Sequence, residues 1–325
     1  MLKEHMDNKT IYKKTLTFSL RRLAWDVASI IVIILLSAGG LFLAEKLSAN
    51  GLIGFAIGLG VGILLVAICS HFISYMFKAG QIAMMTKGIT DGKLPDDVYG
   101  EGKKIVKERF LTVAAYYAVT NAIKGIFSQL GRLITSVGEA IGGNNGGVVG
   151  STISSMIQTI VNYLCDCCLG WVFYRSDESA VKATLSGAVL FFRHGKTLAK
   201  NLGRVFGIAL ISFIAIGGVF FGIFYLVSMA FPEAFAKLAE AIAKSGDDVP
   251  EFLTNAQGLM LTVSGIGGVC MWGILHSVFV RPFILVGVLR NYIESGKSEV
   301  ITEADLDELD QKSSKFKKLH QKAEA

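Results

Sequence analysis

The chain of 325 residues is only 18% charged and 52% apolar, with a mean hydropathy of +0.52. Soluble domains carry roughly a quarter charged residues, so this composition, with its long apolar runs, excludes an ordinary soluble protein. The net charge of +6 reflects basic residues around those runs and gives no reason to expect nucleic acid as a partner. The sequence predicts an all-α polytopic membrane helix bundle.

Six apolar segments are expected to cross the bilayer, because an α-helix needs about 20 apolar residues to span the hydrocarbon. A basic interfacial helix at 1–23 precedes the membrane domain, 24–290, and a charged tail occupies 291–325. The third segment contains Lys124 and Arg132, so a tilted, partly buried or interfacial helix is the alternative there. The predicted spans lie at about 24–45, 51–76, 110–135, 147–173, 205–230 and 257–280.

Basic residues are unevenly distributed between the two sets of loops. Four stretches that lie before, between or after the predicted spans hold 27 of the 32 Lys and Arg residues: 1–23, 77–109, 174–204 and 281–325. Cytoplasmic flanks carry an excess of these residues, so both termini are predicted to be cytoplasmic. The protein is accordingly expected in the plasma membrane or an inner membrane.

Small residues recur at helical spacing in several spans. Gly54, Gly58 and Gly62 stand four residues apart in the second span, and Gly218 and Gly222 repeat this spacing in the fifth. Such spacing lets helix backbones approach closely within a membrane. A compact bundle is the main interpretation, and a dimer interface is the alternative.

Two stretches hint at an internal repeat. KTLTFSLRR, 14–22, aligns without gaps to KTLAKNLGR, 196–204, and each directly precedes a predicted span. Both are expected to be basic interfacial helices whose Leu and Phe side chains dip toward lipid. The hypothesis is a pair of parallel repeats, with the third and fourth spans inserted between them. Coincidence between two similar amphipathic stretches is the alternative.

The stretch NYLCDCCLGW places Asp166 inside an apolar run. A carboxylate facing lipid costs about 2.5 to 3.5 kcal/mol on insertion scales, so Asp166 is expected to face protein or a water-filled cavity. His71 and His276 are expected at a similar depth, with Arg281 at the border of the last span. These four residues are the candidate lining of a pathway. A structural hydrogen bond, or an ion pair of Asp166 with Arg281 or Lys124, is the alternative.

The five cysteines all fall within predicted spans, so no disulfide framework is expected. Cys165 and Cys168 share a helix face and are weak candidates for half of a metal site, with Cys69, His71 and His276 as further ligands. Plain burial and reversible acylation are the stronger interpretations. No cofactor is therefore expected.

The C-terminal half carries a resemblance to a known family. GSTISSMIQTIVNYLCDCCLGW, followed by LFFRHGKTLAKNLGRV, a span, an external loop, a last span and a charged tail, resembles choline-transporter-like membrane proteins. Their G-S-x-I start, helical glutamine, cysteine-rich patch and N-x-x-R-V entry are matched, over less than half of this chain. The large external domain of that family is missing. The resemblance implies a transporter-like fold, with choline or related amines as substrates by analogy, and identifies no binding residue.

No enzyme motif emerges, since G-x-S-x-G, H-E-x-x-H and Walker sequences are absent. We expect a membrane protein that moves a small solute, a lipid component or an ion. The alternative is a non-catalytic scaffold that recruits proteins through the interfacial helices and the tail. Membrane lipids, a protein partner at the tail and a second copy of the chain are the expected partners.

Overall fold

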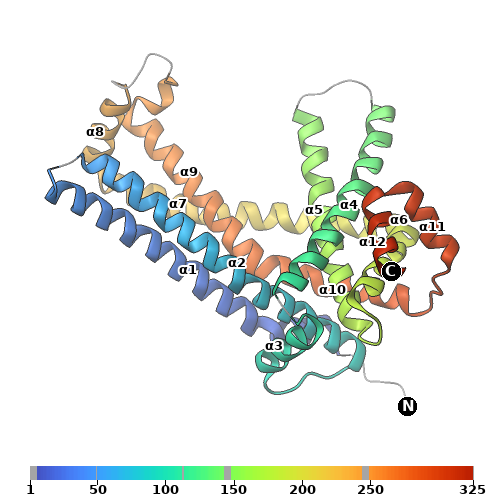
Figure 1. The fold of residues 1–325 in the computed structure, drawn as a ribbon. Helices are drawn as coiled ribbons and strands as arrows, with labels where there is room; N and C mark the ends of the chain where they lie inside the picture. Colours follow the sequence, from blue (N-terminus) through green and yellow to red (C-terminus); the bar gives the residue numbers. More distant parts are fainter. Residues whose placement is uncertain (1–5, 49, 112, 143–147, 244–248, 325) are drawn as a thin grey trace. The chain divides into compact units, whose positions relative to one another are not determined.

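The computed structural model describes residues 6–48, 50–111, 113–142, 148–243 and 249–324, and these residues form helices and no strand. The predicted all-α fold is therefore confirmed (Figure 1). Two π-helical turns, Phe213–Gly217 and His276–Val280, connect α6 to α7 and α9 to α10. The α-helices are α1 Asn8–Lys46, α2 Gly51–Asp91, α3 Val98–Arg109, α4 Val113–Gly142, α5 Val148–Tyr174, α6 Ala180–Ser212, α7 Gly218–Met229, α8 Pro232–Ala243, α9 Ala256–Leu275, α10 Arg281–Lys297, α11 Glu303–Lys312 and α12 Ser314–Glu324.

Among the described residues, four helical stretches are long and apolar enough to cross a membrane: Asn8–Lys46, Ile53–Asp91, Gly207–Met229 and Ala256–Lys297. A fifth candidate is the pair of α3 with the start of α4, which is bent by 82°. The predicted third span, 110–135, overlaps the second helix of this pair, α4. The predicted fourth span, 147–173, corresponds to α5, where most side chains of the first half lie outside the description. Six spans therefore remains a prediction.

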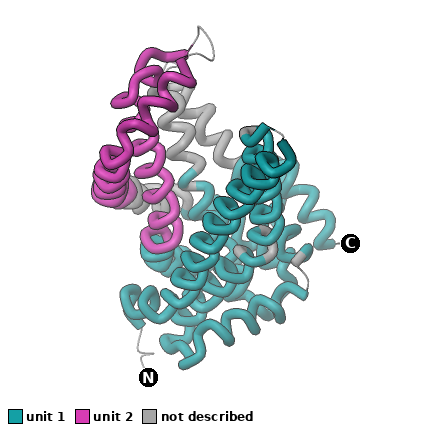
Figure 2. Tube along the Cα trace, turned by 90° about the vertical axis from the view of Figure 1, so that its left-hand side faces the viewer, with its two compact units in different colours: residues 1–202, 282–325 teal, residues 203–281 magenta. Residues whose placement is uncertain are grey.

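The chain divides into two compact units (Figure 2). Unit 1 comprises Met1–Leu202 and Pro282–Ala325, and unit 2 comprises Gly203–Arg281. The predicted boundaries at 23 and 290 do not coincide with helix ends, because α1 and α10 each run through them without a break.

In unit 1, α1 and α2 pack along one another as a helical hairpin (Figure 1). The two helices share an exposed apolar band over residues 27–43 and 53–68, as expected for surfaces that face lipid. Toward the start of α1 and the end of α2, outside this band, large apolar side chains are buried instead of exposed. Large apolar side chains of α1 and α2 that are almost fully buried there are Ile11, Phe18, Ile82, Met84, Met85 and Ile89.

Phe18 corrects the expectation for one side chain of residues 14–22, because it does not dip toward lipid. Its ring is fully buried and packs with Met84, Leu94 and Val98. Gly102 faces the same ring, since a Cβ there would lie 2.6 Å from Phe18 Cζ. The first turns of α1 are thus part of the protein core, where burial of such a ring stabilises the fold by about 1.5–3 kcal/mol.

Glycines form the closest contact between α1 and α2. A Cβ at Gly54 would collide with the Gly40 carbonyl, and one at Gly58 would collide with the Leu36 carbonyl. Gly62 is slightly less constrained, because its Cβ would lie 3.1 Å from Ile33 Cα. Close backbone approach therefore runs along the apolar band of this hairpin.

In unit 2, α7 packs on α9. The packing role expected for Gly218 and Gly222 is not seen here, since a Cβ at either would meet nothing within 4 Å. The close approach instead involves Gly268, whose Cβ would lie 2.8 Å from the carbonyl oxygen of Gly217. A spacing of four residues between glycines does not by itself determine which face of a helix meets its neighbour.

The C-terminal tail packs against the rest of unit 1. Phe316 is fully buried and Leu309 nearly so. Arg193 of α6 pairs with Glu299 at 2.7 Å and with Asp305, while the Lys312 ammonium lies 3.9 Å from the ring centre of Phe192. The charged tail thus has an apolar side that packs against the protein.

Replacing Gly58 with Ala should lower the free energy of unfolding by about 1–3 kcal/mol, because the added methyl group forces the α1 and α2 backbones apart. Gly60→Ala is the matched control, since a Cβ at Gly60 meets nothing within 4 Å. Both variants gain about 1 kcal/mol of helix propensity, which cancels in the comparison. Thermal unfolding of the purified protein in detergent measures the difference. Equal stability of the two variants would contradict the close packing.

Asp305→Asn should destabilise the docked tail at pH 7 by about 1 kcal/mol, as expected for loss of a helix cap. Hydrogen bonds from Thr302, together with Arg193, lower the pKa of Asp305 from 3.8 to about 2. The carboxylate therefore contributes its full stabilisation above the ordinary pKa and loses it as the pH falls through about 2.

Unfolding curves of wild type and variant should accordingly converge as the pH is lowered from 5 toward about 2. Asp307→Asn, on the exposed face of the same helix, should change stability little at any pH. A gap between wild type and Asp305→Asn that does not depend on pH would contradict the role of the ionised carboxylate.

Candidate functional site

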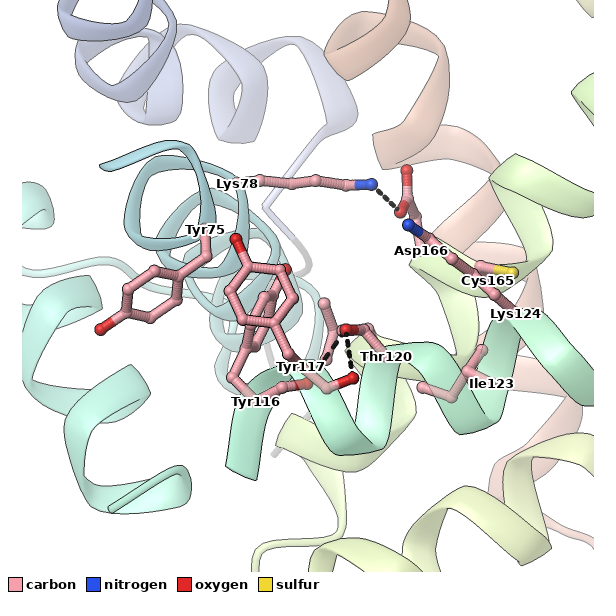
Figure 3. A pocket seen from close by; sticks show the side chains of 10 residues that line it. Tyr75, Lys78, Tyr116, Tyr117, Thr120, Ile123, Lys124, Cys165 and Asp166 are labelled. Carbon is pink, nitrogen blue, oxygen red and sulfur yellow. Dashed lines mark hydrogen bonds and ion pairs between the residues drawn. The ribbon is translucent and has the colours of Figure 1, made fainter. Parts of the chain in front are cut away.

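The candidate site is a pocket in unit 1 where α2, α4 and α5 meet (Figure 3). It has a volume of about 170 Å³, which is room for several water molecules or a small polar group. We call it the tyrosine pocket. Its lining residues are Tyr75, Lys78, Tyr116, Tyr117, Thr120, Ile123, Lys124, Cys165, Asp166 and Leu169.

Helical spacing explains how each element supplies its part of the lining. Tyr75 and Lys78 are three residues apart on α2, so they project from one face. On α4, Tyr117, Thr120 and Lys124 follow at intervals of three and four residues and form one stripe. The tyrosine pocket is therefore built by regular helix faces rather than by loops.

The bend between α3 and α4 brings two of the tyrosines to α2. The Tyr75 ring centre lies 5.0 Å from that of Tyr116 and 6.2 Å from that of Tyr117. Arg109, at the end of α3, donates hydrogen bonds of 2.6 and 2.9 Å to the carbonyls of Glu178 and Arg175. These bonds tie the end of α3 to the turn between α5 and α6 and so fix where α4 begins.

Asp166 lies in the wall of the pocket and pairs with Lys78. The distance from Lys78 Nζ to Asp166 Oδ1 is 2.6 Å, and the carboxylate side chain is only 3% exposed, against 36% for the lysine. Figure 3 shows Lys78 and Lys124 directed toward Asp166 from opposite sides. A second cation thus stands near a carboxylate that is already paired, which leaves the lining with one excess positive charge.

The expected environment of Asp166, protein or a cavity, agrees with this geometry, and its described ion-pair partner is Lys78. Arg281 and His276 belong to unit 2, where His276 Nδ1 lies 3.1 Å from Ser212 Oγ. Trp272 Nε1 also donates to Ser212 Oγ, at 3.1 Å. The side chain of His71 lies outside the described residues. The pathway of Asp166, His71, His276 and Arg281 therefore stays a prediction.

The weak metal candidates occupy different environments. Cys165 lines the tyrosine pocket, whereas Cys168 is fully buried with its thiol 3.8 Å from the Thr184 carbonyl. In the described part of the chain, no three His, Cys, Asp or Glu side chains gather in a way that holds a metal.

Sequence reasoning missed Lys78 and the tyrosines as site residues. Lys78 follows the second apolar run and has the position of an ordinary flanking cation. The pair Tyr116 and Tyr117 sits at the start of the irregular third segment, where amphipathic aromatics are common at membrane borders. The only available signal was the spacing of Tyr75 and Lys78 beside an apolar run.

Comparison of this chain with protein-family models, curated proteins and solved structures finds no match. The class of the protein consequently rests on its helices: it is an all-α integral membrane protein with several long apolar helices. The choline-transporter-like resemblance stays a prediction.

Breaking the Lys78–Asp166 pair should have unequal effects on stability. Lys78→Met removes the described ion-pair partner of a buried carboxylate and should cost about 3 kcal/mol. Asp166→Asn should cost only about 1 kcal/mol, because the half-exposed lysine can turn to water. The double variant should recover most of the loss in Lys78→Met.

Denaturation of each variant in detergent measures these differences, with Lys124→Met as the control that removes a pocket cation without a described ion pair. A Lys78→Met variant as stable as Lys124→Met would show that the buried carboxylate does not depend on Lys78.

Proposed function

We propose that the protein moves a small solute, a lipid component or an ion, and that the tyrosine pocket is its binding site. The observation that supports this proposal is the Lys78–Asp166 pair in the pocket wall. A buried charge in a membrane protein is costly and usually serves an ion or substrate site. Here both signs of charge, and tyrosine rings beside them, surround a space of about 170 Å³.

The position of the pocket along α2 supports the proposal. The exposed apolar band of α2 ends at Ile68, and Lys78 follows ten residues later, about 15 Å along the helix axis. A single unbroken helix thus runs from the lipid-facing surface to the pocket. A ligand bound there would lie close to the membrane border, where tyrosines are favoured.

The same ion pair also supports the competing function of a non-catalytic membrane scaffold. In that case Lys78 and Asp166 only join α2 to α5, and the pocket is a packing defect beside them. The two functions differ in one respect: a carrier needs the pocket to be open to solutes, whereas a scaffold does not.

Orientation belongs to the proposal as well. We place both termini on the cytoplasmic side of the plasma membrane or an inner membrane, on the basis of the 27 basic residues that flank the predicted spans. The tyrosine pocket then lies toward the cytoplasmic side, since its lining residue Lys78 belongs to one of those basic segments.

Labelling of Cys165 tests both the openness of the pocket and its side. In single-cysteine variants, a membrane-impermeant maleimide should label Cys165 in inverted vesicles and not in right-side-out vesicles. Cys167 and Cys168, which are fully buried, should react only after denaturation. Solutes that slow the labelling of Cys165 are then candidate ligands.

Uptake of such a protecting solute into liposomes tests transport itself. The charge-neutral double variant Lys78→Gln, Asp166→Asn should remain folded and lose uptake at least about tenfold, the effect of removing one charged hydrogen bond. A Cys165 that stays unlabelled in the folded protein, or wild-type protein without uptake, would favour the scaffold. A double variant with full uptake would show transport that does not use the tyrosine pocket. Labelling from the outside alone would reverse the proposed orientation and leave the pocket intact.

A further inference from the structure

A second hollow in unit 1 lies where α4, α5 and α12 meet, with a volume of about 430 Å³. We call it the lysine hollow. Two lysines, two asparagines and a serine are among its described lining residues, and that lining includes no carboxylate. Its residues are Asn121, Lys124, Gly125, Ser128, Val161, Asn162 and Lys315.

Lys315 is held over the hollow by the docking of α12. Gln129 Oε1 accepts hydrogen bonds from Ser313 Oγ at 2.6 Å and from the Lys315 backbone N–H at 3.1 Å. Gln129 Nε2 donates to Ser314 Oγ at 3.0 Å. One amide of α4 thereby fixes the start of α12, and the position of Lys315 is set before any ligand binds.

Gly125 provides the space for the lysine. A Cβ at this position would lie 2.7 Å from Lys315 Cδ and 3.2 Å from Lys315 Nζ. The lysine chain therefore lies against the α4 backbone, with its ammonium at the hollow. Lys124, the preceding residue on α4, is the second lysine that lines the hollow.

We propose that the lysine hollow binds a phosphate-bearing anion. The described lining has two lysines and no carboxylate, so these residues give the hollow a charge of about +2, which matches the charge of a phosphate group near neutral pH. Asparagine and serine side chains offer further hydrogen bonds to phosphate oxygens. The N-terminus of α12 adds favourable backbone dipoles. The proposal does not rest on solute transport, and the two sites share only Lys124.

Such a phosphate group can belong to a lipid headgroup or to a free anion, and one experiment separates the two. The full chain in detergent is titrated with sodium phosphate against sodium chloride of equal ionic strength. A parallel titration uses dihexanoyl phosphatidic acid against dihexanoyl phosphatidylcholine. Thermal unfolding reports binding, because a ligand of the folded state raises the melting temperature.

We expect phosphate-bearing anions to raise the melting temperature and Lys315→Gln to weaken the apparent affinity at least about tenfold, the effect of one charged hydrogen bond. Lys315→Arg should keep most of the affinity. The matched control is Lys322→Gln, which removes the same charge from the exposed face of α12 and should change the affinity less than about twofold.

Stabilisation by both inorganic phosphate and phosphatidic acid supports the site and shows that the phosphate group suffices. Stabilisation by phosphatidic acid alone supports the site and identifies a lipid headgroup as its source. No stabilisation beyond the chloride and phosphatidylcholine controls, or equal weakening in Lys322→Gln and Lys315→Gln, overturns the proposal.

Discussion

The length of the first two helices constrains the rest of unit 1. A helix of 39 to 41 residues is about 60 Å long, roughly twice the hydrocarbon thickness of a bilayer. Half of each helix therefore leaves the lipid and needs protein to cover its apolar side chains. The structure meets this requirement through the reversal of burial along α2, from exposed Ile68 to buried Ile82 and Met84. α3 and the other helices of the packed part of unit 1 provide this cover.

The Lys78–Asp166 pair lies where this reversal occurs. On one side of it α2 is exposed and apolar, and on the other side it is buried by protein. An ion pair at that border is screened less than a surface pair and avoids the full cost of a pair in hydrocarbon. The two side chains differ in exposure for the same reason, since the carboxylate projects into the protein and the lysine reaches toward solvent. Under the proposed function, a ligand would displace the lysine, because it is the more exposed partner.

The sequence predicted the fold class because a shortage of charged residues, combined with long apolar runs, is typical of membrane helices. It also identified Asp166, since a carboxylate in an apolar run must be compensated. The compensating residue was not predictable, because Lys78 is 88 residues away and has the position of an ordinary flanking cation. Gly58 and Gly222 show the same limit: both have the small-residue spacing, yet only Gly58 meets a neighbouring backbone. Phe18 was assigned to lipid because amphipathicity does not distinguish a membrane surface from a protein core.

Lys124 is common to the two polar sites, and this has a physical consequence if both proposals hold. Its ammonium contributes the excess charge of the tyrosine pocket and half of the charge of the lysine hollow. An anion in the lysine hollow would draw Lys124 away from Asp166, so the tyrosine pocket would become less positive. Binding at one site would then change affinity at the other, and linkage requires the effect to be reciprocal. Because α12 supplies Lys315, the docked tail would take part in this coupling without touching the tyrosine pocket.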